Sequence, residues 1–179
     1  MRYPTKEECE KLLNKYETPE HVKKHCRTVA YTACGIGGAL KAKGYNLDTD
    51  LIMAAGMLHD IVRVRDRHWE EGAHIVKELG YDDISDIINV HMHYSPFSKI
   101  EDVTETDMVC LADRLVKEDK YVGVDERIEY IIDKASKNGH PEAKPFILEK
   151  KKDTQRFIDE IENVVGISID ELMRKDIKG

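Results

Sequence analysis

The sequence contains no uninterrupted apolar run of the length that a membrane-spanning helix requires, which is about 18 residues, so we expect no membrane span. Its first residues, MRYPTKEECEKLL, include no apolar segment of the kind found in secretory signals. The four cysteines form no CxxC pair. Unpaired thiols in a chain without a secretory signal are typical of a reducing compartment, and we therefore expect a cytoplasmic location.

Two common catalytic motifs are also missing. The chain has no Gly-x-Ser-x-Gly elbow and no P-loop, so a serine hydrolase of the elbow type, a kinase and a Walker NTPase are all disfavoured. The net charge is −7, which argues against a protein that coats nucleic acid. We therefore expect a small-molecule partner, with no nucleic-acid polymer and no membrane. Assembly into a homo-oligomer stays open.

The patterning predicts one all-α domain over residues 1–179, because no strand pattern, internal repeat or linker is evident and the length supports one core. We expect a motif core over about 20–120, with C-terminal helices over about 125–177 packed on it. Capping signals and apolar periodicity place the helices. The first opens at Thr5, and the others cover about 19–43, 48–64, 68–79, 83–92, 105–117, 125–137, 142–164 and 169–177.

The long second helix has a distinctive start and an unusual interior. Thr18 and Pro19 suit the N-cap and first helical positions. Gly35, Gly37 and Gly38 lie inside the same helix. Glycine weakens a helix interior, so these three residues indicate close packing or a kink.

The pair His59-Asp60 is the most informative feature of the chain. It lies in LIMAAGMLHDIVRV (51–64), which predicts a helix that is apolar almost all round and therefore buried. A buried lone carboxylate costs several kcal/mol unless a partner compensates it. A metal ion would compensate both side chains at once.

Helical phase places further imidazoles and carboxylates on apolar faces. In the helix over 83–92, for example, Ile84, Ile88 and His91 fall at i, i+4 and i+7. The inward polar residues are His25, His59, Asp60, His68, His91 and Asp113. Each alone fits a hydrogen-bonded core residue. Together, with no comparable set of buried Ser, Asn or Gln, they indicate a metal site. A mixed nitrogen and oxygen donor set suits Mn, Fe, Co, Ni or Zn, and the absence of thiolate argues against a structural zinc.

Five segments in order resemble the HD-domain metal-dependent phosphohydrolase superfamily, which is named for its adjacent His-Asp pair. They are HCRTVA, LHDIVR, HWEEGAHIVKELG, IINVHMH and CLADRLVK, and they span about residues 20–120. The resemblance implies an all-α helical bundle of the HD type around a central metal site.

The resemblance also implies one or two divalent transition metals. His25, His59, Asp60 and Asp113 would hold the first. His68 and His91, with Asp60 bridging, would hold the second. Many members of the superfamily keep only the first set, so one metal and two metals are both open.

Cationic groups should face the substrate phosphate. Arg63 is four residues beyond His59, and Lys117 is four residues beyond Asp113, so each would rise on the same helix face as a proposed ligand. We expect Asp60, Arg63 and Lys117 to form the catalytic group. A surface salt bridge is the alternative for each cation. In the following loop, Tyr94 and Phe97 either line the mouth of the site or pack within the loop.

The sequence and the resemblance together predict a phosphatase or phosphodiesterase. It would act on a small phosphate ester, most plausibly a nucleotide, by attack of a metal-bound hydroxide. Two alternatives stay open, a di-iron HD-type oxygenase and a non-catalytic metal-binding or ligand-sensing module. A cyclic-dinucleotide phosphodiesterase of the HD-GYP type fits poorly, because no Gly-Tyr-Pro string occurs.

Overall fold

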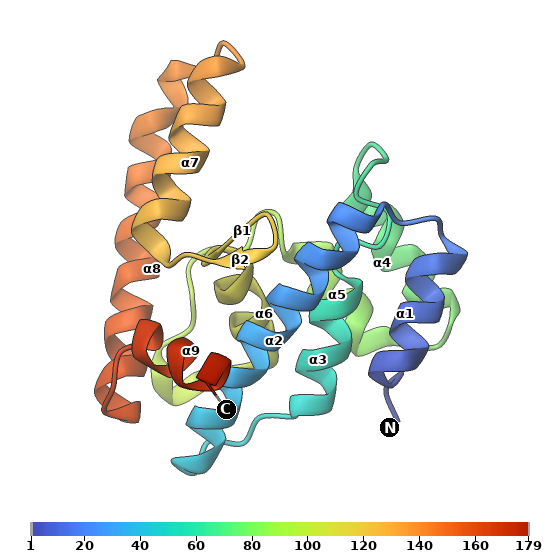
Figure 1. Ribbon diagram of the computed structural model, residues 1–179, viewed down its shortest axis with the longest axis horizontal. Coiled ribbons are helices and arrows are strands. Elements are labelled where there is room, and N and C mark those ends of the chain that lie inside the picture. The colour runs from blue at the N-terminus through green and yellow to red at the C-terminus, as the bar shows by residue number, and fades with distance from the viewer. Residues whose placement is uncertain (1, 179) are drawn as a thin grey trace.

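The fold is a bundle of helices, with two helices projecting from its body (Figure 1). The computed structural model describes the backbone of residues 2–178 and the side chains of residues 2–175. The elements in chain order are α1 (Lys6–Lys15), α2 (Glu20–Ala42), α3 (Thr49–Leu58), α4 (His68–Glu78), α5 (Asp82–Val90), η1 (Ile100–Asp102), α6 (Glu105–Asp113), β1 (Val116–Lys117), β2 (Lys120–Tyr121), α7 (Val124–Lys137), η2 (Pro141–Ala143), α8 (Lys144–Val165) and α9 (Ile169–Lys178). The prediction of an all-α fold is confirmed.

Two predicted helices are shorter than expected. The helix predicted over 48–64 ends at Leu58, and turns in which an N–H bonds the carbonyl three residues earlier follow it, as at Ile61 and Arg63. The helix predicted over 105–117 ends at Asp113. Sequence periodicity continues an apolar pattern through such turns, because buried turn residues are apolar too.

A small hairpin replaces the last turn of the helix predicted over 105–117. Val116 pairs with Tyr121 and Lys117 with Lys120, in antiparallel register. Glu118 in the connecting turn has a φ of 55°, which is uncommon for a residue with a Cβ. The expectation of no strand is therefore wrong for these four residues, since strands of two residues are too short to show an alternating pattern.

The second helix begins one residue later than its capping signal predicts. Pro19 is the N-cap of α2 and makes no side-chain cap bond. The Thr18 hydroxyl instead donates a hydrogen bond of 2.6 Å to the Ile61 carbonyl, in the turn after α3. Thr18 therefore fastens the backbone next to the His-Asp pair rather than the start of its own helix.

Helices α2 and α3 pack closely because glycines lie between them. A Cβ built on Gly56 of α3 would lie 2.6 Å from the Ala30 Cα of α2, and one built on Gly37 would lie 2.8 Å from the Ile52 Cδ1. No real Cβ approaches backbone so closely. Of the glycines of α2, Gly37 therefore permits close packing against α3, whereas Gly38 faces open space.

The C-terminal helices contact the core while α7 and α8 extend beyond it. One cluster of buried apolar side chains includes Phe157 and Ile161 of α8 and Ile169 and Met173 of α9, together with residues of α1–α6. Figure 1 shows α7 and α8 side by side as an arm, with the β1–β2 hairpin at the base of α7. Within residues 2–178, no helix combines the length and apolar character that crossing a bilayer demands.

Candidate metal centre

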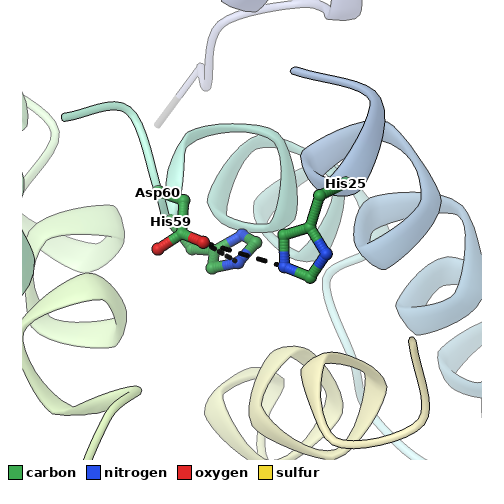
Figure 2. Close-up of side chains that lie close together, drawn as sticks. All are labelled: His25, His59 and Asp60. Carbon is green, nitrogen blue, oxygen red and sulfur yellow. Dashed lines mark ion pairs between the residues drawn. The ribbon is translucent and has the colours of Figure 1, made fainter. Parts of the chain in front are cut away.

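Most of the nominated residues lie at helix ends that converge inside the bundle. His59 and His91 are the C-cap residues of α3 and α5, and Asp60 follows directly after His59. The other three are His68, the first residue of α4, Asp113, the last residue of α6, and His25, which comes from within α2. Figure 2 shows the side chains of His25, His59 and Asp60 pointing toward one another.

One oxygen of Asp60 faces the first histidine pair. The Asp60 Oδ2 lies 3.4 Å from the His59 Nε2 and 3.7 Å from the His25 Nε2. The Asp113 Oδ1 lies 3.0 Å from the same His25 nitrogen and 3.6 Å from that of His59. Two imidazoles and two carboxylates thus surround one point, and His25, His59 and Asp60 have the spacing of a metal-holding group.

The other oxygen of Asp60 faces the second histidine pair. The Asp60 Oδ1 lies 3.2 Å from the His68 Nε2 and 3.4 Å from the His91 Nε2. Asp60, His68 and His91 form a second group with metal-holding spacing. The two groups share Asp60, one oxygen to each, which is the arrangement of a bridging carboxylate.

Backbone carbonyls fix the orientation of three imidazoles. The His59 Nδ1 donates to the Gly56 carbonyl at 2.7 Å, and the His91 Nδ1 donates to the Ile88 carbonyl at 2.7 Å. Each bond places a proton on Nδ1 and orients the ring so that its Nε2 faces the carboxylates. Metal-binding histidines are held by the same kind of outer hydrogen bond.

The third orienting carbonyl comes from the hairpin. The His25 Nδ1 donates to the Glu118 carbonyl at 2.6 Å, and the Thr28 hydroxyl donates to the Asp119 carbonyl at 2.8 Å. The turn that places Glu118 at positive φ therefore orients a candidate ligand. The sequence could not predict this contact, because every residue type has a backbone carbonyl that can accept a hydrogen bond.

Four buried atoms at the centre have no hydrogen-bond partner among the described residues. They are the Nε2 atoms of His59, His68 and His91 and the Oδ1 of Asp60. Buried polar atoms are nearly always paired, so each requires an explanation. A divalent cation would satisfy all four at once, and the donor set is the nitrogen and oxygen mixture that transition metals accept. The residues present therefore fit a metal.

Electrostatics keep both carboxylates ionised. Burial by itself raises the pKa of Asp60, but attraction to the neighbouring His59 and the close approach of His68 and His91 outweigh burial and hold the pKa well below its ordinary value. Asp113 behaves in the same way, with burial opposed by His25 and His59. Burial by itself lowers the pKa of His59, but attraction to Asp60 together with the contributions of Cys26 and Asp113 outweighs burial, so the pKa is raised. The carboxylates are thus in the charged form that binds cations.

A cavity of about 1000 Å³ opens over the centre. His25, Asp60, His91 and Asp113 all contribute to its lining. Arg63 lines it too, from the turn after α3 rather than from a helix. The Arg63 Nε lies 3.8 Å from the Asp60 Oδ2, and its side chain is 46% exposed. A guanidinium beside the shared carboxylate and open to the cavity can meet an anionic ligand.

Lys117 does not lie where the helical phase predicts. It is in β1, not on α6 above Asp113, and the lining of the cavity over the centre does not include it. Its Nζ lies 5.0 Å from the centre of the Tyr130 ring. It borders a neighbouring hollow that also includes Tyr130 and Lys134. The prediction that Lys117 rises beside Asp113 on a shared helix is wrong, because the helix ends first.

The loop aromatics pack rather than line the cavity. Phe97 is buried and stacks on Phe157, with ring centres 4.8 Å apart. The Tyr94 hydroxyl donates to Asp107 at 2.8 Å. Neither residue is among those that line the cavity over the centre.

Part of the cavity wall comes from α7, a helix that contains none of the sequence motifs described above. Arg127, Tyr130 and Lys134 line it. They follow at i, i+3 and i+7, the spacing of one helix face. That spacing was the available signal, but only the fold shows that this face meets the His-Asp centre.

Comparison with known proteins agrees with the geometry. The family model of the HD domain matches residues 22–118. An uncharacterised protein of Methanocaldococcus jannaschii is 32% identical over an alignment of 145 positions, gaps included, that covers 72% of this chain and 85% of that protein. A tRNA (cytidine(56)-2'-O)-methyltransferase of Thermoplasma volcanium is 26% identical over an alignment of 185 positions, gaps included, that covers 94% of this chain and 50% of that enzyme. No solved structure matches.

Proposed function

Because the chain belongs to the HD domain family, whose members bind divalent metals and include phosphohydrolases, we propose that it is a metal-dependent phosphohydrolase. Its substrate would be a small phosphate ester, and a nucleotide fits best. The observation that carries the proposal is Asp60, which offers one carboxylate oxygen to each of two histidine pairs whose Nε2 atoms face inward.

Each residue of the centre has a separate part in the proposed reaction. When bound, the metal supplies a Lewis acid that activates water and offsets charge on the phosphoryl oxygens. His25, His59, Asp60 and Asp113 would hold one ion, and His68 and His91 together with Asp60 would hold a second. Arg63 binds the phosphate through its guanidinium at the open side of Asp60. The cavity above admits the rest of the substrate.

The relatives leave the substrate open. One has no assigned function, and the name of the other concerns methylation of a tRNA ribose. This chain matches only half the length of that methyltransferase, so its named activity does not transfer. It does justify adding a short RNA with a terminal phosphate to any substrate panel.

Loss of Asp60 tests the proposal. We expect the full chain, purified without chelator and reloaded with Mn, Fe, Co, Ni or Zn, to hydrolyse members of a panel of phosphomonoesters and phosphodiesters. Asp60→Ala should reduce turnover to background, because it removes a ligand of both metal groups. His74→Ala is the matched control, since His74 is an exposed surface residue that faces Glu78. Its activity and metal content should equal those of the wild type.

Two other outcomes would assign a different function. Oxygen uptake by the iron-loaded chain, without phosphate release, would indicate the di-iron oxygenase. Tight metal binding without turnover of any substrate would indicate a binding or sensing module. Equal turnover by Asp60→Ala and the wild type would refute the proposed centre itself.

A further inference from the structure

Three cations gather around one aromatic ring on the α7 side of the cavity. The Arg127 guanidinium carbon lies 5.5 Å from the centre of the Tyr130 ring, the Lys134 Nζ 5.9 Å and the Lys117 Nζ 5.0 Å. Cations at such distances are attracted to the ring face. Tyr130 therefore holds three positive groups in one place, which we call the α7 cation cluster.

The α7 cation cluster has no carboxylate partner. Within residues 2–175, none of its three cations forms an ion pair, and the buried Arg127 Nε has no hydrogen-bond partner. Several other arginines pair with carboxylates, as Arg27 does with Glu10 and Arg156 with Asp153. In a chain of net charge −7, three unpaired cations around one ring form a local positive patch, which an anionic ligand would neutralise.

Two cations of the cluster share a cavity with the His-Asp centre. Arg127 and Lys134 line it together with Asp60 and His91. The volume of about 1000 Å³ is at the upper end of the range for small-molecule sites. Acidic residues also line the cavity, namely Glu20, Asp66, Glu118 and Asp119. Their charge disfavours an anion except near the cations.

We propose that the α7 cation cluster binds a second phosphate group of the substrate, away from the phosphate that faces the His-Asp centre. The inference rests on the proposed phosphohydrolase function and narrows it. The substrate class becomes a small molecule with two separated phosphates, such as a nucleoside 3',5'-bisphosphate. Arg127 and Lys134 contact the distal phosphate directly, and Lys117 adds charge from the hairpin.

Calorimetric binding to the metal-loaded full chain tests the inference with two matched probes. The probes are adenosine 5'-monophosphate and adenosine 3',5'-bisphosphate. Loss of one charged hydrogen bond weakens binding by about 10- to 100-fold. We expect Arg127→Ala and Lys134→Ala each to weaken bisphosphate binding to that extent and to leave monophosphate binding within about twofold. Arg127→Lys should keep most of the affinity, because it keeps the charge.

Lys137→Ala is the control, since Lys137 is an exposed cation on α7 that does not line the cavity over the centre. It should leave both affinities unchanged. Lys134 is also exposed, so its replacement should not disturb the fold. If Arg127→Ala loses helicity, Lys134→Ala therefore tests the distal phosphate site. In turnover assays, Arg127→Ala should raise KM for the bisphosphate and leave kcat nearly constant.

The outcomes separate this inference from the proposed hydrolase activity. If the variants weaken binding of the bisphosphate but not of the monophosphate, and no substrate is turned over, the distal phosphate site is supported and the hydrolase activity is refuted. A second outcome would overturn the distal site alone. In it the chain hydrolyses phosphate esters, but Arg127→Ala and Lys134→Ala weaken the binding of both nucleotides equally or of neither. Dependence on these two residues for a short RNA but not for the bisphosphate would also overturn it.

Discussion

Asp107 shows how one buried carboxylate organises the loop beside the candidate centre. It is fully buried at the start of α6. It accepts hydrogen bonds from the Tyr94 hydroxyl, the Ser98 N–H, and both the N–H and the hydroxyl of Thr104. Those donors lie on both ends of the segment that follows His91. Asp107 therefore closes the loop that connects α5 to α6.

Replacing Asp107 should be costly. Asp107→Ala leaves four partly buried donors without their acceptor, and we expect the free energy of unfolding to fall by about 2–4 kcal/mol. Tyr94→Phe removes a single donor and should cost about 1 kcal/mol. Urea denaturation followed by circular dichroism measures both. Equal stability of Asp107→Ala and the wild type would show that the loop does not depend on this carboxylate.

At this scale the sequence predicts more of the candidate centre than of its surroundings. Helical phase and the five family strings nominate His25, His68 and His91, and the fold brings them together with the other three nominated residues. The orienting carbonyl of Glu118 and the buried Asp107 could not be found in this way. A carbonyl is common to every residue type, and a carboxylate near a helix start is ordinarily a solvated cap.

The contact between α2 and α3 is the element-level feature on which the centre depends. Gly56 lets the two helices touch, and its carbonyl accepts the hydrogen bond from His59. The same residue thus sets both the helix separation and the orientation of an imidazole.

A methyl group at Gly56 should disturb both functions. Gly56→Ala places a Cβ against the backbone of Ala30, and we expect a loss of about 1–3 kcal/mol in unfolding free energy, together with weaker metal binding. Gly38→Ala is the control on α2, since its Cβ meets no atom within 4 Å. It should stabilise the chain by about 0.5–1 kcal/mol, as alanine does in a helix interior. Thermal denaturation and metal titration of the two variants measure the contrast.

Helix ends are where predictions for the elements fail. The apolar pattern extends through residues 59–64 although α3 ends at Leu58, and it extends past Asp113 although α6 ends there. The difference between predicted and observed helix ends matters for Arg63 and Lys117, because their expected positions assumed that both helices continue. Arg63 still reaches the cavity over the centre from a turn, whereas Lys117 does not line it.

At the scale of the whole molecule, burial of the thiols reports on the integrity of the bundle. Cys9, Cys26 and Cys110 lie on three different helices and are fully buried. Burial raises the pKa of Cys9 and Cys110 to about 12 and that of the partly buried Cys34 to about 11. The reactive thiolate is therefore scarce at neutral pH.

Thiol labelling should accordingly be slow until the chain unfolds. We expect an aromatic disulfide reagent at about pH 8 to react slowly with the folded protein and with all four cysteines after denaturation. Raising the pH should speed the reaction, because a thiol with a raised pKa forms its reactive thiolate only at higher pH. Rapid reaction of Cys9 or Cys110 in the folded chain would contradict the burial of α1 or α6.

The bond from His25 to the Glu118 carbonyl bears on where the chain can be shortened. A fragment that ends at Asp113 would contain every imidazole and carboxylate of the candidate centre. It would nevertheless lack the acceptor that fixes the tautomer of His25, along with the Asp119 carbonyl that Thr28 engages. Any minimal expression boundary has to lie beyond the hairpin, even though the hairpin itself supplies no ligand side chain.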